Sequence, residues 1–191
     1  MQLFSIHTES ANLTEEQFFM LCADNKELRI ERDKDKNIII MAPTTLDTGN
    51  RNADILGEVV IWNKKTKSGY CFDSNAGYTL PNGAVRSPDI SWISKEKYTL
   101  LPQSEKNRFG KICPDFVIEI KSKSDNIKQL KEKMEEWITN GCQLAWLIDI
   151  ENRSTHIYKP NTETTEQSFE AILSGENVLE EFQLKLNEII I

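Results

Sequence analysis

Hydrophobic positions along the chain recur at the two spacings that distinguish helices from strands. Near the start, Thr14 and Gln17 have the spacing of a capping box, in which each side chain bonds to the other residue's main chain. Phe18 and Leu21 follow at helical intervals. This stretch therefore predicts a short helix that runs to about Asn25.

Later stretches alternate between strand and helix patterns. Apolar runs at 28–31 and 38–41 flank a polar tip and predict a hairpin. Ile55 and Val59 share one face of a helix that is expected at 47–67. Further strands are expected at 70–72, 78–80, 84–93, 116–120, 144–148 and 155–159, with a helix and loop at 95–108 and a helix at 126–140.

The stretch from residue 116 to residue 148 has the order strand, helix, strand. A crossover of this kind places two parallel strands side by side. The earlier strands are joined by tight turns such as Pro81-Asn82-Gly83 and are expected to be antiparallel. The predicted fold class is therefore α/β, with a mixed central β-sheet flanked by helices and an N-terminal helix and hairpin as an extension.

The composition is that of an ordinary globular protein, with 39% hydrophobic and 28% charged residues among 191. The sequence has no secretory leader pattern and no apolar stretch of the roughly 20 residues that a membrane span needs. Its four cysteines form no C-x-x-C pair, which favours free thiols in a reducing compartment. We expect a single cytoplasmic domain over 1–191, with a core at about 43–160 and an acidic segment at 161–191.

Charge is distributed unevenly along the chain, whose formal net charge is −7. The segment 161–191 holds seven glutamates and one lysine, whereas 106–133 holds eight lysines and arginines against four acidic residues. The basic stretch favours contact with a polyanion, although a solvated helix face has a similar composition. The acidic segment is expected either to be a solvated C-terminus or to screen a functional site.

The sequence from Asp115 to Lys121 combines charged side chains with an apolar strand. Because side chains alternate between the two faces of a strand, Glu119 and Lys121 share one face, while Phe116 and Ile118 point into a core. Burying charge is costly unless the charge is paired or bound to a metal. An ion pair on an edge strand is the alternative explanation. The acidic-x-Lys pattern alone is weak, because roughly two or three matches are expected by chance.

A divalent ion that activates water needs a second acidic ligand. Asp115 lies on the same strand as Glu119 and about 13 Å away, since a strand rises about 3.3 Å per residue. Asp89 follows a proline on a different strand and can pair beside Glu119. We therefore expect Asp89 and Glu119 to bind Mg²⁺ or Mn²⁺. Lys121 is expected to position or help deprotonate the attacking water, and Asp115 to cap its strand or support the site.

Other charged residues are candidates for supporting roles. Asp54 or Glu58, on the helix expected at 47–67, could supply a third ligand to the metal. Arg86 and Lys123 are expected either to meet phosphate groups or to be ordinary surface cations.

Three sequence blocks together resemble one protein family. The blocks are residues 80–92, 114–125 and 146–160. In this order and spacing they resemble the family of small endonuclease-like proteins, formerly a domain of unknown function, within the PD-(D/E)XK superfamily. The resemblance implies a restriction-endonuclease-like core and a divalent metal. The family's acidic pair and lysine fall on Asp89, Glu119 and Lys121, whereas the acidic residue usual on the first helix has no clear counterpart.

Two functions from different classes follow. The first is a Mg²⁺-dependent endodeoxyribonuclease that hydrolyses DNA phosphodiester bonds, acting as a homodimer that doubles the small basic surface. The alternative is a catalytically degenerate nuclease fold that serves as a nucleic-acid or protein interaction module.

Overall fold

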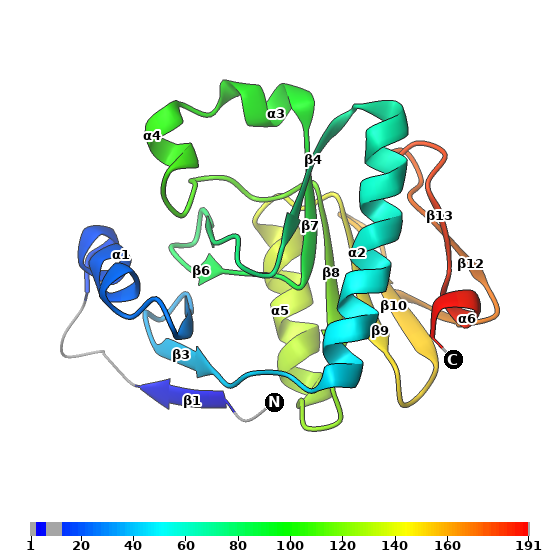
Figure 1. Cartoon of the computed structure of the whole chain (residues 1–191), viewed down its shortest axis with the longest axis horizontal. Coiled ribbons are helices and arrows are strands. Elements are labelled where there is room, and N and C mark those ends of the chain that lie inside the picture. The colour runs from blue at the N-terminus through cyan, green and yellow to red at the C-terminus, as the bar shows by residue number, and fades with distance from the viewer. Residues whose placement is uncertain (1–2, 7–12, 191) are drawn as a thin grey trace.

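A computed structural model describes residues 3–6 and 13–190 of the chain (Figure 1). The helices are α1 (Glu15–Asp24), α2 (Leu46–Thr66), α3 (Lys95–Leu100), α4 (Gln103–Lys106), α5 (Ile127–Thr139) and α6 (Leu186–Ile189). The strands are β1 (Leu3–Ile6), β2 (Arg29–Arg32), β3 (Ile38–Met41), β4 (Gly69–Asp73), β5 (Tyr78–Thr79), β6 (Val85–Arg86), β7 (Ile90–Ser94), β8 (Phe116–Lys121), β9 (Leu144–Asp149), β10 (Ser154–Tyr158), β11 (Thr165–Ser168), β12 (Ile172–Ser174) and β13 (Gln183–Lys185). None of the helices described is long and apolar enough to cross a membrane.

The centre of the molecule is a six-stranded sheet with the strand order β11-β10-β9-β8-β7-β4. As predicted, β8 and β9 are parallel, and the other neighbours are antiparallel. Helices α2 and α5 cover opposite faces of this sheet (Figure 1). Val59 of α2 packs in the same core as Phe116, and Trp137 of α5 packs in the other core with Val117. The mixed sheet flanked by helices confirms the predicted fold class.

Strand β8 is an interior strand, because it is bonded to β9 on one side and to β7 on the other. All six of its residues are buried, including Glu119 and Lys121. The edge-strand ion pair is therefore the wrong explanation for these charges. Two charged side chains inside a sheet need partners on the helix and loops that cover it.

A second sheet has the order β1-β3-β2-β6-β5 and carries the predicted hairpin β2–β3. The single strand expected at 84–93 is wrong, since β6 belongs to this sheet and β7 to the central one. Val85 pairs with Arg32, whereas Ile90 pairs with Ile118. Pro88 lies at the break between them, where its lack of an N–H prevents a continuous ladder. The chain thus changes sheets just before Asp89.

The acidic C-terminal segment is packed against the core and is not a solvated tail. Its apolar residues join the core on the α2 side of the central sheet. The Phe182 ring lies 5.7 Å from the ring of Trp62 and 6.1 Å from that of Trp146. The indole N–H of Trp62 also donates to the carbonyl of Glu180 at 2.8 Å. The glutamates of the segment are exposed, while its apolar residues pack against α2 and the sheet.

Truncating Phe182 to alanine should destabilise the protein by about 3–5 kcal/mol, because it removes a buried aromatic ring and leaves a cavity. The neighbouring substitution Glu180→Gln changes an exposed side chain and should alter stability by less than about 0.5 kcal/mol. Urea unfolding of the two variants measures both values. Equal, small effects would show that the C-terminal segment does not belong to the core.

Candidate functional site

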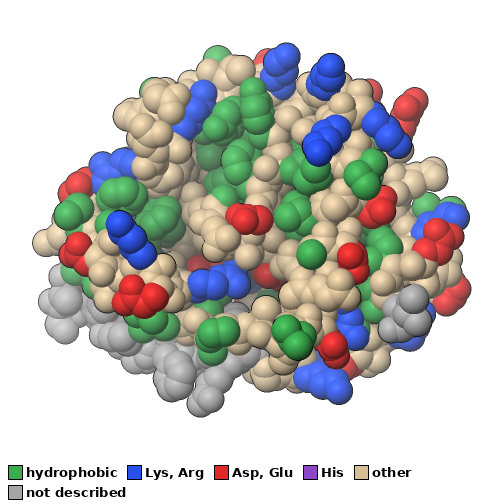
Figure 2. All heavy atoms as spheres, viewed as in Figure 1, with side chains coloured by type: hydrophobic (Ala, Val, Ile, Leu, Met, Phe, Trp, Pro, Cys, Tyr) green, Lys and Arg blue, Asp and Glu red, His purple; other side chains and the backbone are tan. Residues whose placement is uncertain are grey.

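A cavity of about 1240 Å³ opens between the β2–β3 hairpin, the start of α2, the end of β8 and helix α5. Glu31, Asp89, Glu119 and Lys133 line it together with Arg86. Figure 2 shows a hollow near the middle of this face, in which cationic and acidic side chains lie close together. The cavity therefore gathers charges from both sheets and from α5.

Lys133 of α5 lies between two carboxylates. Its ammonium is 2.8 Å from Oε1 of Glu119 and 3.0 Å from Oε1 of Glu31. The indole N–H of Trp137, one helical turn further along α5, donates to the same Glu119 oxygen at 3.2 Å. Helix α5 thus fixes Glu119 through two donors on its sheet-facing side.

Asp89 is held beside β8 by the main chain. Its Oδ2 accepts the N–H of Ile120 at 2.8 Å, at the point where β7 begins to pair with β8. This arrangement brings the carboxylates of Asp89 and Glu119 to the same end of two neighbouring strands. The aspartate selected by the distance argument therefore lies next to Glu119, as expected.

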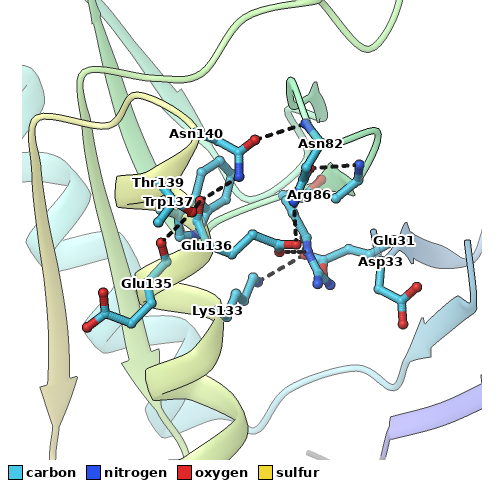
Figure 3. Close-up of polar contacts among 12 residues, drawn as sticks. Glu31, Asp33, Asn82, Arg86, Lys133, Glu135, Glu136, Trp137, Thr139 and Asn140 are labelled. Atoms are coloured by element: carbon cyan, nitrogen blue, oxygen red, sulfur yellow. Dashed lines mark hydrogen bonds and ion pairs between the residues drawn. The ribbon is translucent and has the colours of Figure 1, made fainter. Parts of the chain in front are cut away.

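Arg86 joins Glu31 to α5 (Figure 3). Its Nη1 donates to Oε2 of Glu31 at 3.1 Å, and its Nε donates to Oε2 of Glu136 at 2.6 Å. The main-chain N–H of Ser87 donates to the other oxygen of Glu31 at 2.9 Å. Arg86 is therefore a buried, doubly paired residue, and its interpretation as an ordinary surface cation is wrong.

The carboxyl groups of the cavity respond differently to their surroundings. Burial raises the pKa of Glu119 to about 7; the nearby Asp89 and Glu31 carboxylates also raise it, while Lys133 opposes the shift. Burial likewise raises the pKa of Asp89. Burial would raise the pKa of Glu31 too, but Lys133 and Arg86 outweigh it and hold that pKa below its usual value. Asp89 and Glu119 are therefore the carboxyl groups of the cluster whose charged form is disfavoured, although Lys133 lies beside Glu119.

The cluster fits a divalent cation by charge and by donor type. The four carboxylates Glu31, Asp89, Glu119 and Glu136 outnumber the cations that act on them, which are Arg29, Arg86 and Lys133. Carboxylate oxygens are the ligands that Mg²⁺ and Mn²⁺ prefer. No ready-made group of three or more acidic, histidine or cysteine ligands exists among the described residues. The ammonium of Lys133 lies between Glu31 and Glu119, so Asp89 and Glu119 remain the candidate pair.

Lys121 lies apart from this cluster. Its ammonium is 2.8 Å from Oε2 of Glu151 and 3.6 Å from Oδ1 of Asp149, and it does not line the cavity. The hydrogen bond that Lys121 donates to Glu151 raises the pKa of Lys121. The structure thus directs Lys121 towards the turn after β9, while Lys133 occupies the position beside Glu119 that was expected for Lys121.

The remaining candidates have other surroundings. Asp54 and Glu58 are exposed on α2 and do not line the cavity, so Glu31 is the third acidic residue of the site. Lys123 is exposed. Asp115 accepts the N–H of Ser94 at 2.8 Å and the ammonium of Lys97 at 2.9 Å, outside the cavity. Asp115 therefore connects the start of β8 to the end of β7 and to α3, and its carboxylate contacts within the described part of the chain do not cap its own strand.

Comparison with known proteins places this arrangement in a family. The sequence profile of Uma2, described as a putative restriction endonuclease, matches residues 15–187. The chain belongs to the Uma2 family. A crystal structure titled a putative nuclease of DUF820 from Anabaena variabilis matches with a TM-score of 0.74 and 20% identity, over 93% of this chain and 97% of that one. No curated protein matches the chain.

The Uma2 match covers the N-terminal hairpin as well as the central sheet. It therefore includes Glu31 and Lys133, which sequence reasoning missed, together with Asp89 and Glu119. The crystal structure shares the fold over almost its whole length, which agrees with the restriction-endonuclease-like core that the sequence blocks implied.

Proposed function

We propose that this Uma2 protein is a metal-dependent endonuclease that hydrolyses DNA phosphodiester bonds. One observation carries the proposal: the ammonium of Lys133 lies 2.8 Å from Glu119 in a cavity that Asp89 also lines. Two carboxylates and a lysine in one cavity are the groups that metal-assisted attack on a phosphodiester requires. The family description and the nuclease title of the similar structure support the same reaction class.

Asp89 and Glu119 would hold the divalent cation, Mg²⁺ or Mn²⁺. When bound, such an ion lowers the pKa of a water molecule and neutralises charge on the phosphate. Before binding, the raised pKa of Glu119, about 7, lets this carboxyl keep a proton near neutral pH. Glu119 therefore exchanges that proton for the positive charge of the cation, and binding should weaken below pH 7.

Lys133 would act as a donor and a cation. Burial alone would lower its pKa, but Glu119 and Glu31 outweigh burial and raise it, so the amine is protonated at neutral pH. A protonated lysine orients the attacking water through its N–H bonds and stabilises the charge that develops on the phosphate. Glu31 fixes the lysine in place by accepting a second N–H bond. Lys133 thus takes the role that the sequence pattern gave to Lys121.

The acidic character of the cavity makes substrate binding depend on the cation. Arg86 and Lys133, two of the cations that line the cavity, are already engaged with carboxylates. DNA phosphates meet few free positive charges there, and phosphate contacts supply most of the affinity for DNA. Removing the divalent ion should therefore reduce DNA binding as well as catalysis.

Conversion of supercoiled plasmid to nicked and linear forms tests the function. Wild-type protein should cleave with Mg²⁺ or Mn²⁺ and lose all cleavage in EDTA, because the acidic pair then lacks its cation. A plasmid left intact with both metals, or cleaved equally well in EDTA, would contradict the proposal. Intact plasmid without Mn²⁺-induced thermal stabilisation would favour an interaction module.

A further inference from the structure

Arg86 and Glu136 connect the third acidic residue of the site to helix α5. Figure 3 shows the Arg86 guanidinium between the carboxylates of Glu31 and Glu136. Glu31 stands on β2 in the five-stranded sheet, whereas Asp89 and Glu119 belong to the central sheet. The position of Glu31 in the cavity therefore depends on contacts with Arg86 and Ser87 at the end of the neighbouring strand β6, and with Lys133 of α5.

We infer that Arg86 and Glu136 are positioning residues: Glu136 fixes the guanidinium of Arg86, which in turn holds the Glu31 carboxylate under Lys133. The inference rests on the proposed function and adds residues that do not touch the acidic pair. The Arg86 fork uses Nε for Glu136 and Nη1 for Glu31, an arrangement that a lysine cannot reproduce, because its single nitrogen has no rigid planar geometry. The order of contacts is Glu136, Arg86, Glu31, Lys133.

Glu136 is itself anchored from a second direction. Asn82, in the turn between β5 and β6, donates its side-chain amide to Oε1 of Glu136 at 2.9 Å. The main-chain N–H of Asn82 donates to Oδ1 of Asn140 at 2.9 Å, and the Asn140 amide donates to the Glu136 carbonyl at 2.8 Å. These bonds fix the β5–β6 turn to the end of α5 (Figure 3). Glu136 therefore has both oxygens engaged before any substrate arrives.

The burial and pairing of Arg86 distinguish a positioning role from a role in phosphate binding. The Arg86 side chain is 11% exposed, and both carboxylates that face it accept hydrogen bonds from it. Burial alone would lower the pKa of Arg86, but Glu31 and Glu136 raise it, so the residue is a permanent cation committed to these two partners. The two carboxylates neutralise the guanidinium, which favours a positioning role for Arg86 over contact with phosphate groups.

Amide hydrogen exchange of the metal-free protein tests the positioning directly. The Ser87 N–H donates to Glu31, so its protection reports whether that carboxylate stays in place. Protection should fall about tenfold in Glu136→Gln and in Arg86→Lys. Glu135→Gln is the matched control: it removes the same charge from an exposed neighbour on α5 that points away from Arg86 (Figure 3). Wild-type protection of Ser87 in Glu136→Gln would overturn the inference.

Cleavage kinetics test the link to the site. Glu136→Gln and Arg86→Lys should each lower kcat by about 10- to 100-fold at saturating Mn²⁺, with KM for DNA unchanged. Because Glu136 acts through Arg86, adding Glu136→Gln to Arg86→Lys should cause no further loss. Additive losses, or a raised KM with a shallower salt dependence, would overturn the inference in favour of separate roles or phosphate contact. If wild-type protein lacks activity, the proposed function fails, and the exchange experiment still decides the positioning.

Discussion

Replacing Lys133 by methionine is expected to lower the rate of DNA cleavage by about 100- to 1,000-fold, the usual cost of losing a charged donor at the reacting group. Methionine keeps most of the side-chain volume but removes the ammonium between Glu119 and Glu31. Glu119 then loses the group that holds its pKa down, so it retains its proton more firmly. The variant should fold, because its uncompensated carboxyls can be protonated.

Lys121→Met is the matched comparison, since it removes the lysine of the same strand that carries Glu119. Lys121 pairs with Asp149 and Glu151 outside the cavity, and Asp149 keeps its hydrogen bonds from the main-chain N–H groups of Glu151 and Asn152, so the loss of Lys121 should cost about 1–3 kcal/mol of stability. The folded variant should cleave within about threefold of the wild-type rate. Single-turnover cleavage and urea unfolding measure the two effects. Loss of activity in Lys121→Met with full activity in Lys133→Met would reverse the assignment.

Replacing Glu119 by glutamine should abolish cleavage and at the same time stabilise the metal-free protein at alkaline pH. Loss of one metal-binding carboxylate should lower the rate by about 1,000-fold or more. The pKa of Glu119 is about 7 in the folded protein against an ordinary value of 4.5. A raised pKa means that the stability contributed by this group is present below pH 4.5 and lost as pH rises through about 7.

The Glu119→Gln variant does not lose this stability as pH rises, because its side chain does not titrate. In EDTA, its stability relative to wild type should rise by about 2 kcal/mol between pH 5 and pH 8. Mn²⁺ should remove the difference at pH 8 by stabilising wild-type protein alone, because binding to the native state adds to its stability. Urea unfolding of both proteins at pH 5 and pH 8, with EDTA or with Mn²⁺, measures the stability difference between them under each of the four conditions. A stability gap that shrinks as pH rises would contradict the charge balance assigned to the cluster.

Much of the fold could be predicted from the sequence because its signals are local. The hairpin β2–β3, helix α2 and the β8-α5-β9 unit follow from the spacing of apolar residues and from turn signals. The break between β6 and β7 was missed because strand-like residues lie on both sides of the stretch 86–89, and only tertiary pairing separates the two sheets. The packed C-terminal segment was missed because its apolar residues follow no regular helical or strand spacing and lie among seven glutamates.

The site could be predicted only where its residues share a strand or lie on adjoining strands. Asp89 and Glu119 met that condition. Lys133 and Glu31 are 102 residues apart in sequence, and no local pattern joins them. One signal was present: Lys133 lies four residues before Trp137 on the apolar face of the clearest helix in the chain, where a lysine needs a buried partner. The strand that holds Glu31 offers no comparable signal.

The position of the metal tests most directly whether Asp89, Glu119 and Lys133 form the catalytic centre. Crystals soaked in Mn²⁺ and measured near the manganese absorption edge locate the ion by its anomalous signal. We predict an anomalous peak about 2 Å from carboxylate oxygens of both Asp89 and Glu119. A peak at Asp149 and Glu151 beside Lys121, with none at Asp89 and Glu119, would contradict it.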